Sequence, residues 1–191
     1  MPTPSLEGRH QIENASYAIM GLLAQKNLKI AEDSIKKGLI NCFWPARLQN
    51  LKNTKLFKYL PNNYELYLDG AHNEDGATVL SNWIADKNKI EYKETIIIIS
   101  ILERKDCKTY IEHLKNNVNY AIAIDNNNQE FQFKKGEILK KEIEDNGIKV
   151  LNISKTTVGA LQYINNINQG NSKRIIICGS LYYAAEVLEL Q

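Results

Sequence analysis

The stretch Thr95-Ile96-Ile97-Ile98-Ile99-Ser100 decides the fold of this chain. Four consecutive isoleucines, with polar residues only at the two ends of the run, are typical of a strand whose two faces are both covered. The run is much shorter than the ~20 apolar residues that a membrane span needs. It therefore predicts the central strand of a parallel sheet with helices on each side.

Segments with strand character alternate with segments of helical spacing on both sides of this run. The expected strands are Glu65–Leu68, Glu94–Ile101, Tyr120–Ile124, Lys149–Ile153 and Arg174–Cys178. The expected helices between and after them are Asp75–Asp86, Lys108–Asn116, Lys135–Asp145, Thr156–Asn166 and Tyr182–Leu190. Such an alternation indicates βαβ units. We predict an α/β fold with a Rossmann-like, three-layer, mostly parallel sheet.

The N-terminal part of the chain does not share this alternation. Two helices are expected there, at Asn14–Gln25 and Ile30–Leu39, and Pro45 then ends helical structure because proline has no backbone donor. We predict that residues 1–50 are the end of a preceding domain and that residues 51–191 are the Rossmann-like domain.

Composition and charge narrow the class of protein. The 191 residues carry 24 basic and 22 acidic side chains, a balance that argues against a general nucleic-acid or membrane-surface binder. The N-terminus has no basic segment followed by an apolar one, as a secretory signal would. The cysteines Cys42, Cys107 and Cys178 are scattered singly, which favours a reducing compartment over disulfides or a zinc site. We predict a cytoplasmic protein that acts on small molecules, with no nucleic-acid or membrane partner.

Two polar clusters precede the α/β part. Gln11 and Asn14 lie near the start of the first expected helix, and their side-chain amides suit the edge of a nucleotide base, although Asn14 would serve equally well as a helix cap. Arg47 follows Trp44-Pro45-Ala46 and carries a planar, always charged fork that suits phosphate. The alternative for Arg47 is an ordinary solvated surface arginine.

Two further clusters follow expected strands, where ligands bind in open α/β sheets. Within Asp69-Gly70-Ala71-His72-Asn73, Asp69 could accept hydrogen bonds from a ribose, His72 could orient a substrate, and Asn73 could cap the next helix. At Gly179-Ser180, backbone amides and the serine could hold a carboxylate or a phosphate. The alternatives are a polar turn at the first position and a tight turn with a helix cap at the second.

The order of these clusters resembles the dihydrofolate synthase/folylpolyglutamate synthase family of the Mur ligase superfamily. The matching motifs are Gly8-Arg9-His10-Gln11 with Asn14-Ala15, Trp44-Pro45-x-Arg47-Leu48, Asp69-Gly70-Ala71-His72-Asn73 with Asp75-Gly76-Ala77, Lys105-Asp106, and Gly179-Ser180-Leu181-Tyr182. The resemblance implies a ligase that uses ATP and Mg²⁺ to activate a pteroate or folate carboxylate as an acyl phosphate, which the amine of L-glutamate then attacks.

The resemblance also implies roles for single residues. It places Asn14 at the adenine, Arg47 at the phosphates and Asp69 at the ribose of ATP. It places His72 and Ser180 where the incoming glutamate binds. Supporting roles are expected for the remaining motif residues Gln11, Lys105 and Asp106.

One part of the family pattern is missing from this sequence. No glycine-rich segment ending in Lys-Ser/Thr occurs in it, although such a loop cradles the phosphates and helps to hold Mg²⁺. We therefore expect the chain alone to be inactive, with the Mg²⁺ ligands outside it or on a separate ATPase-domain chain. The alternatives are a fragment of a peptidoglycan-type Mur ligase and a retained, non-catalytic nucleotide- or partner-binding module.

Two structural expectations follow from the same comparison. Ala46 stands where the family has glycine, and alanine costs about 1 kcal/mol if that position has positive φ. The N-terminal helices should expose apolar surface that the preceding part of such a ligase would cover.

Overall fold

The computed structural model describes residues 1–27, 29–167 and 170–190, and its centre is a six-stranded sheet. The strand order is β1-β2-β6-β3-β4-β5. β1 runs antiparallel to β2, and the other neighbouring strands are parallel. The strands are β1 (Gln49–Asn50), β2 (Glu65–Leu68), β3 (Glu94–Ile99), β4 (Tyr120–Ile124), β5 (Lys149–Ser154) and β6 (Lys173–Cys178). The mostly parallel sheet is confirmed, and the isoleucine run forms β3 between β6 and β4.

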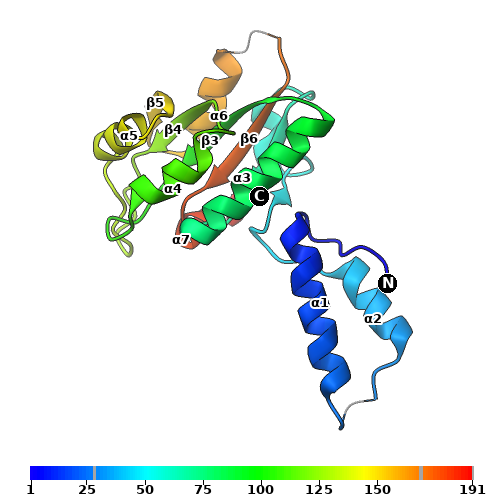
Figure 1. Cartoon of the computed structure of the whole chain (residues 1–191). Helices are drawn as coiled ribbons and strands as arrows, with labels where there is room; N and C mark the ends of the chain where they lie inside the picture. The colour runs from blue at the N-terminus through cyan, green and yellow to red at the C-terminus, as the bar shows by residue number, and fades with distance from the viewer. Residues whose placement is uncertain (28, 168–169, 191) are drawn as a thin grey trace.

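Helices cover both faces of this sheet, as Figure 1 shows. One face packs against α3 (Glu74–Ile90), α4 (Cys107–Leu114) and α5 (Gly136–Asp145). The other packs against the 3-10 helix η1 (Lys55–Tyr59), α6 (Thr157–Asn166) and α7 (Leu181–Leu188). Ile97 and Ile99 belong to the first core and Ile96 and Ile98 to the second, because successive side chains of a strand point to opposite faces. The three-layer prediction is therefore confirmed.

Helices α1 (Arg9–Ala24) and α2 (Glu32–Asn41) form a hairpin that projects away from the α/β body (Figure 1). Gln11 is the buried residue of α1 and Ile35 that of α2. Large apolar side chains of the hairpin and of the segment after it are exposed, among them Tyr17, Met20, Leu23, Phe43 and Trp44. The expected exposure of apolar surface is confirmed.

The start of the first helix differs from the prediction. α1 begins at Arg9, so the interpretation of Asn14 as the helix cap was wrong. Gly8, with a φ of 103° that glycine adopts readily, precedes the helix instead. Glu7 fixes this earlier start, because its carboxylate accepts a hydrogen bond from Trp83 Nε1 at 3.1 Å and pairs with Lys87 Nζ at 3.3 Å, both on α3.

The segment between Pro45 and β2 belongs to the α/β body. Ala46, Leu48 and Leu51 are buried, and η1 adds Leu56 and Phe57 to the core under the sheet. Sequence patterns missed both β1 and η1 because they are too short to show a period. In the part of the chain that the structure describes, no helix is long and apolar enough to cross a membrane.

We expect chymotrypsin to separate the helical hairpin from the body. Tyr17, Leu23 and Phe43 are exposed cleavage sites on or beside the hairpin, whereas the residues from Ala46 onward enter the core. Mass spectrometry of a time course should find a resistant fragment that begins at Trp44 and includes β1. If fragments that retain α1 and α2 survive as long as this core, the hairpin and the body form one cooperative unit and the prediction is wrong.

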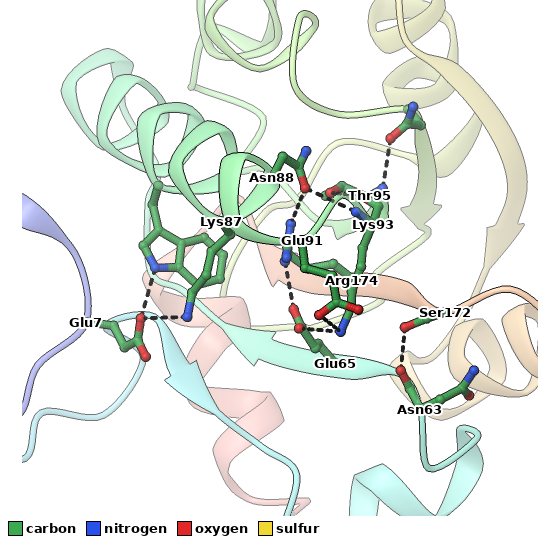
Figure 2. Close-up of polar contacts among 12 residues, drawn as sticks. Glu7, Asn63, Glu65, Lys87, Asn88, Glu91, Lys93, Thr95, Ser172 and Arg174 are labelled. Carbon is green, nitrogen blue, oxygen red and sulfur yellow. Dashed lines mark hydrogen bonds and ion pairs between the residues drawn. The ribbon is translucent and has the colours of Figure 1, made fainter.

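A buried ion-pair network lies at the amino-terminal ends of β2 and β6 (Figure 2). Arg174 is 1% exposed, and its Nε donates to Glu65 Oε2 at 2.8 Å while Nη1 donates to Asn88 Oδ1 at 2.6 Å. Lys93 Nζ donates to the other oxygen, Glu65 Oε1, at 2.7 Å. Burial by itself would raise the pKa of Glu65, but the hydrogen bonds from Lys93 and Arg174 outweigh it and lower that pKa. The network thus joins α3, β2 and β6 at the amino-terminal edge of the sheet, opposite the edge at which Asp69 and Ser180 lie.

Candidate functional site

Asp69 directly follows β2 and connects it to the turn before β1. Its backbone N–H donates to Ile177 O at 2.9 Å, which continues the pairing with β6. Its carboxylate accepts from Leu48 N through Oδ2 and from Ala71 N through Oδ1, both at 2.8 Å. Burial raises the pKa of Asp69, while these two amides and the charge of Arg47 act in the opposite direction. Asp69 therefore holds two loops together in addition to any bond that it makes with a ligand.

The turn that carries Arg47 has a strained backbone. Ala46 has a φ of 54° and Leu48 a φ of 46°, so the condition under which Ala46 costs about 1 kcal/mol is met. Gly70 N donates to Ala46 O at 2.8 Å, which docks this turn on the Asp69 loop. The Arg47 side chain is exposed between the two strained residues. Its charge adds to the effect of burial in lowering the pKa of His10, and it opposes the rise that burial causes in the pKa of Asp69. Arg47 is thus placed at the junction of α1 and the end of β2.

A chain of side-chain amides runs along the first turns of α1. Asn14 Nδ2 donates to Gln11 Oε1 at 3.2 Å, and Gln11 Nε2 lies 2.9 Å from His10 Nε2, which accepts because an amide nitrogen only donates. Burial and the charge of Arg47 lower the pKa of His10. Gln11 is buried and both ends of its amide are hydrogen-bonded, whereas Asn14 is exposed and its carbonyl oxygen accepts no hydrogen bond from the residues that the structure describes. The sequence analysis includes His10 in the motif Gly8-Arg9-His10-Gln11 but assigns it no role of its own.

His72 and Asn73 complete the turn after β2. His72 Nδ1 lies 2.9 Å from Gly70 O, and since a carbonyl only accepts, Nδ1 carries the proton. This bond fixes the imidazole and leaves Nε2 as the nitrogen that can meet a ligand. Asn73 Oδ1 accepts from Gly76 N at 2.9 Å, so the predicted capping of α3 is confirmed.

The turn after β6 contacts the turn after β2. Gly179 N donates to Ala71 O at 3.1 Å, and a Cβ placed on Gly70 would lie 2.4 Å from Leu181 Cδ2. Ser180 is 2% exposed and caps α7 by accepting from Tyr182 N at 3.2 Å. Because the serine oxygen accepts this bond, its O–H remains able to donate. The structure thus brings Asp69, His72 and Ser180 to adjoining turns at one edge of the sheet.

The loop after β3 carries Lys105 and Asp106. Asp106 is exposed and caps α4, with Oδ1 accepting from Lys108 N at 2.9 Å and Oδ2 from Thr109 Oγ1 at 2.6 Å. Among the described residues, neither Lys105 nor Asp106 has a side-chain hydrogen bond to Asp69, His72 or Ser180. Ser100 lies closer to the site: its carbonyl oxygen would be 2.6 Å from a Cβ on Gly179, and its buried Oγ has no partner among the described residues. Sequence reasoning missed Ser100 because it reads as the end of a strand.

Two hollows among the described residues lie away from these turns. A cleft of about 960 Å³ lies between the segment of residues 3–13 and α3, and its lining includes His10, Glu7 and Trp83 but neither Asp69, His72 nor Ser180. An apolar groove of about 510 Å³ runs between α1 and α2 and includes Gln11 and Asn14. The turns after β2 and β6 are the stronger candidate site, because ligands of open α/β sheets bind beyond the carboxyl ends of the strands. Within residues 1–27, 29–167 and 170–190, no group of three or more His, Cys, Asp or Glu side chains could hold a metal ion.

Comparison with known proteins gives a consistent result. A family model described as "Dihydrofolate synthetase, C-terminal domain" matches residues 52–190. The dihydrofolate synthase/folylpolyglutamate synthase of Bacillus subtilis is 25% identical over 186 residues, which cover 96% of this chain and 39% of that protein. The chain therefore spans about two fifths of that relative.

Solved structures match the fold over almost the whole chain. The structure of FolC from E. coli in complex with DHPP and ADP matches with a TM-score of 0.77 and 20% identity, covering 99% of this chain and 40% of that one. The Mycobacterium tuberculosis folylpolyglutamate synthase complexed with ADP and AMPPCP matches with a TM-score of 0.73 and 19% identity, covering 97% and 41%. Both alignments include the helical hairpin, because they cover nearly every residue.

Proposed function

This chain belongs to the dihydrofolate synthetase C-terminal domain family, and on that premise we propose that it is the C-terminal part of an ATP-dependent ligase. The ligase would join L-glutamate to dihydropteroate or to a reduced folate. The observation that carries the proposal is the contact between the Asp69–His72 turn and the Ser180 turn, which places an acceptor, an imidazole and a hydroxyl at one edge of the sheet. The family match supports the folate branch over a peptidoglycan-type ligase.

The reaction would proceed in two steps whose atoms balance. A carboxylate oxygen of the pteroate or folate attacks the γ-phosphorus of ATP, so an acyl phosphate forms and ADP leaves. The amine nitrogen of glutamate then attacks the acyl carbon and loses a proton, and the bond to the phosphate oxygen breaks to release inorganic phosphate. Hydrogen-bond donors held in place beside the reacting groups would supply most of the protein's contribution to lowering the activation barrier.

The residues of this chain would hold the nucleotide and glutamate. Arg47 would meet the phosphates as a permanent cation, and the free Asn14 carbonyl would accept from the adenine amino group. Asp69 would accept from the ribose through its remaining lone pairs, since each of its oxygens already accepts one backbone bond. His72 Nε2 and the Ser180 hydroxyl would bind glutamate. Gln11 would support this set by fixing Asn14.

The phosphate loop and Mg²⁺ are not provided by the described residues. No glycine-rich Lys-Ser/Thr loop occurs in the sequence, and the described side chains offer no group of metal ligands. We derive no step through Mg²⁺ in this chain. The missing groups would come from the rest of a longer polypeptide or from a second chain that carries the ATPase domain.

A chimera tests the proposed function. In it, this chain replaces the matching C-terminal part of the B. subtilis relative, so that the phosphate loop comes from that protein. We expect the chimera to incorporate radiolabelled glutamate into dihydropteroate with ATP and Mg²⁺, and the chain alone to release no ADP. A folded chimera that binds ATP and makes no product would contradict the proposal, and glutamate incorporation by the chain alone would contradict its dependence on the missing loop.

A further inference from the structure

The loop of residues 125–134, which follows β4, reaches α7 at the Ser180 end of the sheet. Asn126 Nδ2 donates to Glu186 Oε2 at 2.7 Å and Asn128 Nδ2 donates to Glu186 Oε1 at 2.5 Å. Glu186 lies on α7, so both of its carboxylate oxygens are held by a loop from another strand. Bonds of this kind to a charged acceptor are stronger than those between neutral groups.

Hydrogen bonds within the loop of residues 125–134 hold its conformation. Asn126 Oδ1 accepts from Asn128 N at 2.8 Å, and Asn128 Oδ1 accepts from Glu130 N and Phe131 N at 2.8 and 2.9 Å. Its far end pairs with the segment after β3 through Glu103 N to Gln132 O and Lys134 N to Ile101 O, both at 2.9 Å. Because the loop is hydrogen-bonded at both ends, its position can determine the position of α7, which it contacts.

The first turn of α7 makes side-chain contacts on two sides. The rings of Phe131 and Tyr182 stack with their centroids 3.9 Å apart and an interplanar angle of 28°. Tyr182 is the residue whose backbone N–H donates to Ser180 Oγ. On the other side, Leu181 lies against Gly70, in the turn that carries His72. The position of Ser180 relative to His72 therefore depends on both contacts.

We propose that the 125–134 loop is a clamp that positions the Ser180 turn, with Phe131, Asn128 and Glu186 acting as positioning residues for the glutamate carboxylate. The proposal rests on the function proposed above, because it assigns glutamate to Ser180. None of these three residues would touch the substrate. They act through Tyr182 and α7, so their loss should weaken glutamate binding and leave ATP binding as it is.

Two measurements on Phe131→Leu test the clamp. In the 191-residue chain without ligand, amide hydrogen exchange should become faster at Tyr182 and Ala184, the latter donating to Ser180 O. In the chimera, the KM for glutamate should rise about 2- to 10-fold, the range expected from losing an aromatic pair, while the KM for ATP stays constant. Asn128→Ala should give the same pattern, and Phe131→Tyr should restore wild-type values. Tyr163→Leu removes an aromatic ring of α6 and serves as the control for general destabilisation.

The outcomes separate the clamp from the proposed function. A chimera without ligase activity would refute the function, and the exchange data would then decide the structural part of the clamp alone. Unchanged exchange at Tyr182 and Ala184 in both Phe131→Leu and Asn128→Ala overturns the clamp. Equal rises in the KM for ATP and for glutamate also overturn it, because they indicate a general loss of structure that Tyr163→Leu would share.

Discussion

Replacing Arg174 with methionine should lower the free energy of unfolding by about 3–5 kcal/mol, the cost of breaking a buried ion pair. Arg174 is almost fully buried, and its guanidinium bonds both Glu65 and Asn88. Its guanidinium carbon also lies 5.8 Å from the centre of the Trp83 ring. Methionine fills similar volume but leaves Glu65 with Lys93 as its remaining hydrogen-bonded cation. Asn88 Oδ1 loses the bond from Arg174 Nη1 and keeps only the longer one from Lys93 N, at 3.3 Å. Urea unfolding of the two proteins measures the difference.

Arg9→Met provides a matched control for this prediction. Arg9 pairs with Asp86 at 3.0 Å, a distance close to that of the Arg174 pair, but its side chain is 82% exposed. Exposed ion pairs contribute ~0–1 kcal/mol, so the comparison measures what burial and the added contacts with Asn88 and Trp83 contribute. A cost for Arg174→Met as small as that for Arg9→Met would show that the network adds little stability.

The same network predicts a pH dependence. The folded-state pKa of Glu65 is lowered from its ordinary value of 4.5, so its stabilisation is present above that value and is lost as the pH falls through the folded pKa. Unfolding free energies measured between neutral and acid pH should therefore fall less steeply in Glu65→Gln than in the wild type. Combining Glu65→Gln with Arg174→Met should cost less than the sum of the two, since each substitution removes the same contact.

The sequence predicted most of the fold because the decisive elements have a clear period. The isoleucine run and the alternating segments on both sides of it correspond to β2 through β6 and to α3 through α7. What it missed has a physical cause in each case. β1 is a two-residue strand defined by its partner, η1 is a single short 3-10 helix, and buried Arg174 depends on Glu65, which is far from it in sequence.

The sequence indicated where the residues of the candidate site lie in the fold, but not which hydrogen bonds they make. Asp69 and His72 follow one strand and Ser180 follows another, parallel strands end at one edge of a sheet, and the two turns that carry these residues are in contact. Nothing in the sequence indicated that Asp69 would bond Leu48 and Ala71, since hydrogen bonds between distant loops leave no periodic signal. The clamp on α7 was missed for the same reason, because Asn126 and Asn128 read as an ordinary polar loop.

Replacing His72 with alanine in the chimera should raise the KM for glutamate roughly 10- to 150-fold, the effect of losing one hydrogen bond to a charged group. His72 Nδ1 is occupied by Gly70 O, so glutamate would meet Nε2. His72→Asn distinguishes the two nitrogens, because the asparagine amide can still donate to Gly70 O but has no group at the position of Nε2. If Nε2 binds glutamate, His72→Asn should be impaired as much as His72→Ala.

Ser180→Ala should raise the same KM by a similar factor, since its hydroxyl would donate to the glutamate carboxylate. Two controls match these substitutions: His113→Ala removes a histidine that bonds Thr78 and Glu74 between α3 and α4, and Ser172→Ala removes a serine before β6, at the opposite end of the sheet. Both controls should keep the KM values for glutamate and for ATP near wild type.

If His72→Ala raised the KM for ATP and left that for glutamate unchanged, His72 would belong to the nucleotide site and the assignment would be wrong. A wild-type KM for glutamate in His72→Asn would show instead that the ring acts only through Nδ1, by holding the turn after β2 in shape.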